Sequence, residues 1–460
     1  MQYRQKSNFT LNVNISKCIF WCGMICLILP GVTSNKILQK IIIQPRIIMI
    51  MPWIAIICIL LFGIKRGASL KATSFDVLLI VMAIFTMRNN FYASIGNTWN
   101  IPRYMALFIT IYFLQRTEYW IDELLNLFSY IYIIYAICTI WFYFDRGFYI
   151  SHIVPMFPDT ASRLIQWYNE GCMAGLVEHY SINGIILGNG IVLYASRLFH
   201  PTKKKGKIWV ALAVSIIAML LTGKRGPLLF VAFALFVLYF LYHSNDKNIV
   251  KKILQVFGIG AVLAAVVLLL YQYVPELATF ISRFQETAES GDVTLGRSAY
   301  WELALELFSK NRFFGAGWGR LLEYTESVIG FQANAHNIYI ELLCETGIVG
   351  LAVFLAWFIG VLAVSIRFFI KSRKKEIICS PLCQYHLMYS IGIQLFFLGY
   401  GFTGNPIYDE VSYIIYFIAC AIALYYHNKL VQSKRRLIYI QRYREGMLTA
   451  GASNKNGFFR

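Results

Sequence analysis

Residues 338–370 read IYIELLCETGIVGLAVFLAWFIGVLAVSIRFFI, and they decide the fold class of this chain. Between Glu345 and Arg367 the stretch carries no charged residue. A helix of about 20 apolar residues is long enough to cross the hydrocarbon layer of a bilayer. The stretch therefore predicts a transmembrane helix that begins near residue 338.

Comparable apolar runs occupy much of the rest of the chain. They lie at 17–33, 44–64, 74–88, 103–116, 124–144, 178–198, 207–223, 226–243, 252–274, 384–402 and 408–427. Of the 460 residues, 58% are hydrophobic and 14% are charged, whereas about 25% are charged in a typical soluble domain. We therefore expect an all-α integral membrane protein with about twelve transmembrane helices.

The basic residues predict how these helices are oriented. The formal net charge is +19, and most basic clusters fall in short gaps at 65–71, 197–207, 247–252, 367–375 and 434–436. All five gaps lie on one side if both termini are cytoplasmic, as the enrichment of Lys and Arg in cytoplasmic loops requires. The charge thus indicates a multi-pass membrane protein with both termini in the cytoplasm. No basic stretch carries a nucleic-acid-binding motif, so we expect no nucleic-acid partner.

Two long gaps, 145–177 and 275–337, are then extracytoplasmic. Both are long enough to contain helices on the membrane surface. Three regions follow: N-terminal transmembrane helices with the first outer loop (1–177), a membrane domain with the outer loop 275–337 (178–427), and a basic cytoplasmic tail (428–460). The ten cysteines form neither a metal-binding nor a disulfide pattern.

Residues 222–227 (TGKRGP) place two cations between two spans on the outer side. Pro227 suits the first turn of the next helix, and Gly226 would let a ligand approach the backbone. Lys224 and Arg225 then flank a helix N-terminus, which favours an anion such as phosphate or diphosphate. The alternative is that both side chains only extend to the membrane interface.

Residues 296–301 (GRSAYW) open an amphipathic helix that we expect to extend to about Phe308. Helical spacing places Arg297, Trp301, Leu305 and Phe308 on one face. A guanidinium binds phosphate oxygens through two parallel hydrogen bonds. Arg283, upstream, adds a further cation. The alternative is that Arg297 caps the helix or pairs within the loop.

Two further segments follow in the same loop. Residues 314–319 (FGAGWG) lack the strand–helix context of a nucleotide-binding loop, which favours a tight turn. Residues 334–339 (NAHNIY) place His336 and Asn337 at the mouth of a span, where an imidazole can exchange a proton. A structural role for His336 is the alternative.

Acidic residues lie beside these segments. Glu345, one turn after Glu341, needs a partner within the membrane edge, either a loop arginine or the site itself. The last outer gap, 401–410 (GFTGNPIYDE), offers small residues and two acids, and its position would let it line a sugar site.

Taken together, these segments resemble the O-antigen ligase/polymerase family of bacterial membrane proteins. The resemblance rests on 222–226, Gly296-Arg297 with Trp301, 314–317, 335–337 and 345–350, in this order, and covers about 180–350. It implies a helical, membrane-embedded glycosyltransferase that uses undecaprenyl-diphosphate-linked glycans without a metal or other cofactor. It also implies that Arg225 and Arg297 hold the diphosphate, and that His336 is the acid/base residue near the acceptor hydroxyl.

The leading hypothesis is a polymerase that joins lipid-linked repeat units into an O-antigen, capsule or exopolysaccharide at the extracytoplasmic face. Its partners would be the lipid-linked glycan, an acceptor glycan, the bilayer and other membrane proteins of polysaccharide assembly. A ligase that transfers the finished glycan to a final acceptor shares the same donor and leaving group. A flippase for the same glycan would predict polar residues along a midplane path, which few spans carry. A structural partner in a biosynthetic complex is the remaining alternative.

Overall fold

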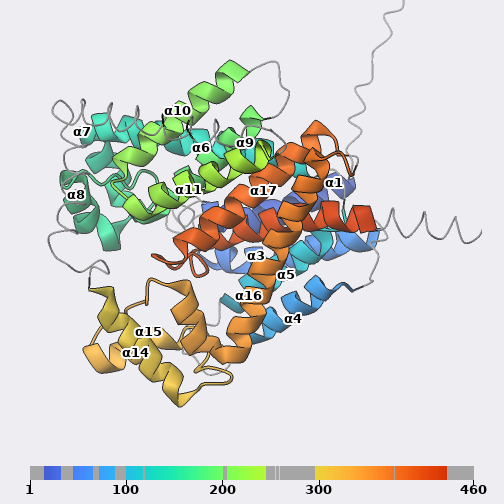
Figure 1. Ribbon diagram of the computed structural model, residues 1–460. Helices are drawn as coiled ribbons and strands as arrows, with labels where there is room; N and C mark the ends of the chain where they lie inside the picture. The colour runs from blue at the N-terminus through green and yellow to red at the C-terminus, as the bar shows by residue number, and fades with distance from the viewer. Residues whose placement is uncertain are drawn as a thin grey trace, which may run out of the picture.

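The computed structural model describes residues 15–32, 45–65, 72–88, 100–117, 120–199, 205–244, 254, 258, 296–377 and 379–431. Within these ranges all regular structure is helical (Figure 1). The all-α fold class is therefore confirmed for this part of the chain.

Eleven of the twelve predicted apolar runs coincide with helices. They are α1 (Ile15–Val32), α3 (Pro45–Lys65), α4 (Ser74–Met87), α5 (Asn100–Leu114), α6 (Ile121–Phe144), α9 (Tyr180–Leu198), α10 (Lys205–Leu221), α11 (Arg225–Tyr242), α16 (Ile338–Arg373), α17 (Pro381–Tyr400) and a last helix, Glu410–Val431. Of the twelfth run, 252–274, only residues 254 and 258 are among the described residues, so the run is not tested.

Four of these helices are long and apolar enough to cross a membrane, namely α6, α11, α16 and Glu410–Val431. Four shorter apolar segments lie at Ile15–Leu29, Met49–Ile64, Ser74–Met87 and Pro102–Leu114. A membrane protein is thus supported by helix length and composition. The count of twelve spans stays a prediction.

Both predicted outer loops contain helices. The first holds α7 (Arg146–Phe148), η1 (Tyr149–Ile153), η2 (Val154–Met156), η3 (Pro158–Thr160) and α8 (Ala161–Asn169). The described part of the second holds α14 (Arg297–Lys310) and α15 (Arg320–Ile329). Figure 1 shows α14 and α15 as a pair beside the lower end of α16.

Helix α9 lies at the centre of the bundle. Its residues 183–196 are all buried, and it packs against α6, α10, α11 and α17. At Gly188 a Cβ would lie 2.7 Å from the ring of Phe396, so a larger residue would displace this ring. Small residues commonly allow such close packing between helices in membranes.

The bundle has two polar ends. We call the first the His336 end: there the N-termini of α9, α11, α14 and α16 meet loop 401–409, and the Ile338 N–H donates to the Gly401 carbonyl at 2.9 Å. We call the other the His386 end: there His386 binds Asp122 at 2.8 Å. The segments of the two predicted outer gaps that surround His336 lie at the His336 end. The side of the membrane that this end faces stays a prediction.

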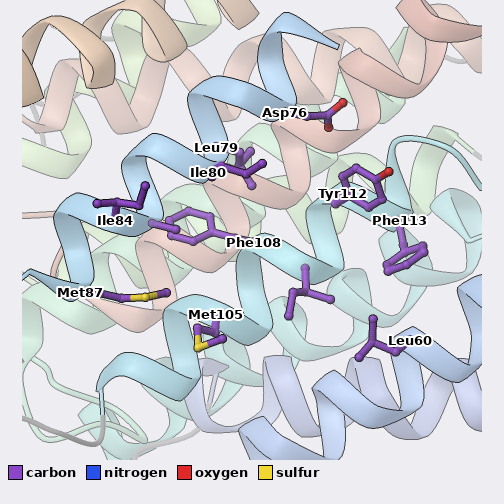
Figure 2. Close-up of a pocket in the computed structure, with 12 residues that line it drawn as sticks. Leu60, Asp76, Leu79, Ile80, Ile84, Met87, Met105, Phe108, Tyr112 and Phe113 are labelled. Carbon is purple, nitrogen blue, oxygen red and sulfur yellow. The ribbon is translucent and has the colours of Figure 1, made fainter. Parts of the chain in front are cut away.

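An apolar cavity of about 460 Å³ lies between α3, α4 and α5 (Figure 2). Asp76 is the one charged residue in its lining, and Gln115 and Arg116 both donate hydrogen bonds to this carboxylate. The other walls are mostly aliphatic and aromatic side chains. Such a cavity suits a hydrocarbon chain and excludes a charged diphosphate.

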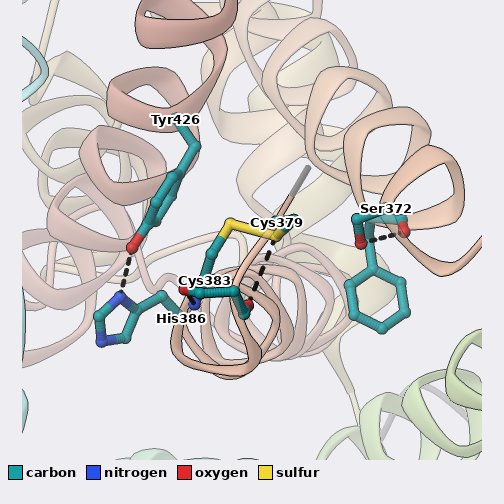
Figure 3. Close-up of a disulfide and its surroundings, with 7 residues drawn as sticks. Ser372, Cys379, Cys383, His386 and Tyr426 are labelled. Atoms are coloured by element: carbon teal, nitrogen blue, oxygen red, sulfur yellow. Dashed lines mark hydrogen bonds between the residues drawn. A yellow bond between two sulfur atoms is a disulfide. The ribbon is translucent and has the colours of Figure 1, made fainter. Parts of the chain in front are cut away.

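The expectation that the cysteines form no disulfide is wrong at one position. Cys379 and Cys383 are joined by a disulfide, with their Cα atoms 5.8 Å apart (Figure 3). Ser380 caps α17 and accepts a hydrogen bond from the Cys383 N–H at 3.1 Å. The capped first turn brings the two cysteines together, which their sequence spacing alone does not indicate.

Candidate functional site

The turn before α11 carries the first two cations. Gly223 has a φ of +63°, a conformation that glycine adopts without strain, and Lys224 is the N-cap of α11. Pro227 lies in the first turn of α11, as predicted. The role expected for Gly226 is corrected: a Cβ there would lie 3.1 Å from the Thr403 hydroxyl, so loop 401–409 occupies the space expected for a ligand.

Helix α14 begins at Arg297, directly after Gly296 (φ +78°). Arg297 Nη1 donates to the Thr403 carbonyl at 2.9 Å, and Trp301 Nε1 donates to the Ala335 carbonyl at 2.8 Å. The predicted face is partly wrong, because Leu305 is 47% exposed. The buried side chains are Ala304 and Leu307, since α14 is rotated to pack against α16.

The backbone around His336 is held from several sides. The Ala335 N–H donates to Glu341 Oε2 at 3.2 Å, and Asn337 Oδ1 accepts from the Tyr339 N–H at 3.0 Å. His336 itself has a φ of +49°, which is uncommon for a residue other than glycine. These contacts fix the turn that presents the imidazole. The side chain of His336 is exposed, and no hydrogen bond to it occurs among the described residues.

The glycine-rich run of the loop pairs with a break in α16. At Gly347 (φ +70°) the helix is interrupted, and the Gly317 N–H donates to the Glu345 carbonyl at 2.7 Å. On the other side of the break, the Ile348 N–H donates to the Arg312 carbonyl at 2.9 Å. A Cβ at Gly315 would lie 2.3 Å from the Glu345 backbone. The tight-turn interpretation is confirmed, and the turn supplies hydrogen bonds that α16 loses at its break.

Glu345 does not pair with an arginine in the described contacts. Its carboxylate accepts hydrogen bonds from the Tyr408 hydroxyl and from the Leu321 N–H, the latter at 3.2 Å. Leu321 lies in the first turn of α15, where free N–H groups attract a carboxylate. Glu345 therefore connects α15, α16 and loop 401–409 behind the site. In its described hydrogen bonds it does not contact the residues proposed to bind the diphosphate.

The predicted cations and the histidine lie close enough together to influence one another electrostatically. Partial desolvation by the surrounding protein, followed by the charges of Arg297 and Lys224, lowers the pKa of His336 to about 4. Burial also lowers the pKa of Arg297, and the charge of Arg225 lowers it further. The free imidazole is therefore neutral at neutral pH and able to accept a proton.

The helix ends strengthen the positive potential of this site. Helices α9, α11, α14 and α16 all begin at the His336 end, so their positive dipole ends add to the cationic side chains. The combination favours a multiply charged anion. Within the described ranges, no three His, Cys, Asp or Glu side chains are grouped so that they could hold a metal ion.

Two residues at this end were not singled out from the sequence. The pKa of Asp409 is raised to about 7, because the effect of burial exceeds the opposing effect of the Lys224 charge. Burial, then the charges of Lys224, His336 and Arg163, lower the pKa of His179 to about 4. The only sequence signals were the position of Asp409 in the last outer gap and that of His179 at the start of a span.

The structure thus brings together most of the predicted site. Lys224, Arg225, Arg297 and His336 interact electrostatically, while Trp301 and Asn337 hold the turn around His336. Glu345 lies one layer behind, and Arg283 lies outside the described residues.

Comparison with known proteins gives one match. No curated protein sequence matches the chain. Residues 210–355, which include Lys224, Arg297 and His336, match the family model described as O-Antigen ligase. The resemblance predicted from the sequence is confirmed over this part of the chain, which is similar to the O-antigen ligase family.

Proposed function

We propose that the chain is a glycosyltransferase that polymerises undecaprenyl-diphosphate-linked repeat units into a surface polysaccharide at the extracytoplasmic face of the bacterial cytoplasmic membrane. The observation that carries the proposal is the approach of Lys224 and Arg297 to a histidine that is neutral before substrate binds, with Arg225 beside Arg297. The family match at 210–355 supports a lipid-linked glycan as the substrate class.

The three cations would bind the diphosphate of the donor. Arg297 donates a hydrogen bond to the Thr403 carbonyl, so the guanidinium is oriented before substrate binds. When the bond between the anomeric carbon and the diphosphate oxygen breaks, the electron pair leaves with the diphosphate. Preorganised cations stabilise this developing charge without reorganisation.

His336 would accept the proton of the acceptor. The hydroxyl oxygen of the acceptor sugar forms a bond to the anomeric carbon, and its proton moves to the neutral imidazole. A bound diphosphate adds negative charge close to His336 and raises its pKa, which makes the imidazole a stronger base. The low pKa of the free site thus fits a base that is activated by the donor.

A ligase is the second candidate. The description of the matching family model favours it, because that description names O-antigen ligase. The donor, the leaving group and the base are common to both reactions. Only the acceptor differs, being another lipid-linked unit for a polymerase and a final carrier molecule for a ligase.

The test is deletion of the gene in its host, with complementation by wild type, Arg225→Ala or His336→Ala. Surface and lipid-linked glycans are then separated on a gel. Single repeat units with no ladder support the polymerase. A ladder that stays on the lipid carrier supports the ligase. Normal glycans in the deletion strain or with both variants would contradict both functions.

A further inference from the structure

A group of aromatic side chains lies beside the cations. We call Trp167, His179 and Tyr180 the Trp167 cluster. The ring centroids of Trp167 lie 4.5 Å from His179 and 5.1 Å from Tyr180. His179 and Tyr180 stack at 4.7 Å with an interplanar angle of 19°. Trp167 comes from α8 in the first outer loop, so this loop reaches the site although the family match begins only at residue 210.

The backbone connects the Trp167 cluster to the cationic turn. The Met173 N–H, four residues after α8 ends, donates to the Leu221 carbonyl at 2.9 Å. Leu221 is the last residue of α10, directly before the turn that carries Lys224. Lys224 Nζ in turn lies 5.0 Å from the centroid of the Tyr180 ring. The aromatic rings and the first cation therefore form one surface.

The Trp167 ring is only half-buried, and the anchoring of α8 comes from another residue. Leu164 is 1% exposed and packs in a small core with Phe142 and Phe157. Trp167 lies one turn further along α8, at the edge of this core. Arg163, which is exposed, precedes it by four residues and influences His179 electrostatically, so both face the same region.

His179 also presents a defined hydrogen-bonding group. Its Nδ1 accepts a hydrogen bond from the Ser181 N–H at 3.0 Å. In a neutral imidazole the proton then resides on Nε2, which is a donor. The cluster thus combines aromatic faces with a polar donor beside a diphosphate-binding surface.

We propose that the Trp167 cluster is a sugar subsite that holds a pyranose ring of the substrate glycan against the side chain of Trp167, next to the diphosphate-binding cations. The C–H face of a pyranose packs on an aromatic ring, while its hydroxyls need donors and acceptors at the rim. Amphipathic aromatic side chains suit such a half-apolar ligand. This inference rests on the proposed function for the identity of the glycan.

The test measures binding and turnover separately in the full-length protein in detergent or nanodiscs. The binding probe is the repeat-unit oligosaccharide released from its lipid, titrated by calorimetry against wild type, Trp167→Ala and Trp167→Phe. Trp141→Ala is the matched control, because Trp141 is 45% exposed and stacks on Phe148 in the same outer region. Thermal unfolding of each variant verifies that it is folded.

We expect Trp167→Ala to weaken oligosaccharide binding roughly 5- to 10-fold, with most affinity kept in Trp167→Phe and all of it in Trp141→Ala. In the polymerisation assay, a raised KM for the acceptor or for the donor then tells which sugar occupies the subsite. Unchanged binding in Trp167→Ala, or no oligosaccharide binding by wild type, overturns the subsite. A wild-type protein that binds oligosaccharide but transfers none overturns the proposed function and leaves the subsite supported.

Discussion

The two polar ends of the bundle use the same residue types in opposite ways. At the His386 end, His386 Nδ1 contacts the Tyr426 hydroxyl at 2.7 Å and Nε2 contacts Asp122 at 2.8 Å. Arg197 donates to the Tyr385 and Ser129 hydroxyls, each at 3.0 Å. At the His336 end, the charges of Arg297 and Lys224 lower the pKa of His336.

This comparison separates a structural histidine from a candidate catalytic one. Both nitrogens of His386 have partners and the side chain is 2% exposed, so the group stabilises packing. His336 is exposed, lies near the cations Lys224 and Arg297, and has a positive φ. An arrangement that costs stability and leaves the group accessible is typical of functional sites.

The largest expected effect comes from the two histidines. His336→Ala removes the base and should lower turnover by about 10²- to 10³-fold. The turnover of His336→Asn should fall as far, although asparagine tolerates the positive φ and so preserves the backbone conformation. His386→Ala should lower the melting temperature and leave turnover per folded molecule unchanged. Polymerisation by purified protein, normalised to folded protein, checks this; equal turnover losses at both ends would break the comparison.

The arginines give the next effect. Arg297→Ala should reduce turnover by about 100-fold, because one group that stabilises the leaving diphosphate is lost. Arg197→Ala loses hydrogen bonds and should reduce the free energy of unfolding by about 1–3 kcal/mol. The measurement is turnover together with chemical denaturation. A large turnover defect in folded Arg197→Ala would show that the His386 end also acts in the reaction.

The break in α16 tests whether the His336 end depends on its supporting loop. Gly347→Ala places a Cβ 2.3 Å from the Phe313 carbonyl at a φ of +70°, so we expect a loss of stability of at least about 3 kcal/mol. Gly206→Ala in α10 is the control, since nothing lies within 4 Å of its Cβ. Thermal unfolding compares the two, and equal melting temperatures would contradict the described break.

The pH dependence sharpens the comparison further. Because the pKa of His336 is lowered from 6.5 to about 4, the neutral base is kept down to about pH 4 in the free protein. The contribution of neutral His336 to the free energy of unfolding is present above pH 6.5 and is lost as the pH falls towards 4. We expect the acidic limb of kcat/KM near pH 4, and that of kcat at higher pH, because bound diphosphate favours the protonated form.

Lys224→Met supplies the control for this profile. Removing the cation should raise the pKa of His336 and move the acidic limb of kcat/KM upward. A limb that does not move would show that neither His336 nor Asp409 controls the profile, because the charge of Lys224 lowers the pKa of both groups.

The smallest expected effect is at the disulfide. Cys379→Ser opens only a short loop before α17 at the His386 end, so melting temperature and turnover should change little. Thiol alkylation of wild-type protein, followed by mass spectrometry, reports whether the pair is oxidised in cells. Disulfides are rare in reducing cytosol, so a fully oxidised pair would argue against the predicted cytoplasmic position of this end.

The sequence by itself determined the long helices of the bundle, because each depends on a local run of apolar residues. It also indicated Lys224, Arg225, Arg297 and His336, since Lys and Arg are normally sparse on the predicted outer side and these residues lie near helix N-termini there. Composition and local pattern are sufficient for these conclusions. The domain boundaries, the number of spans and the side that each end faces remain predictions from the same patterns.

Only the tertiary structure decided which residues surround that constellation. Trp167 and His179 lie well before Lys224 in the chain and Asp409 lies far after it, and nothing local indicates that they meet beside Lys224. The same holds for Glu345, whose partner is Tyr408 across the fold rather than a loop arginine. The physical reason is that long-range contacts depend on how whole helices rotate and cross, and a local pattern fixes neither the rotation nor the crossing.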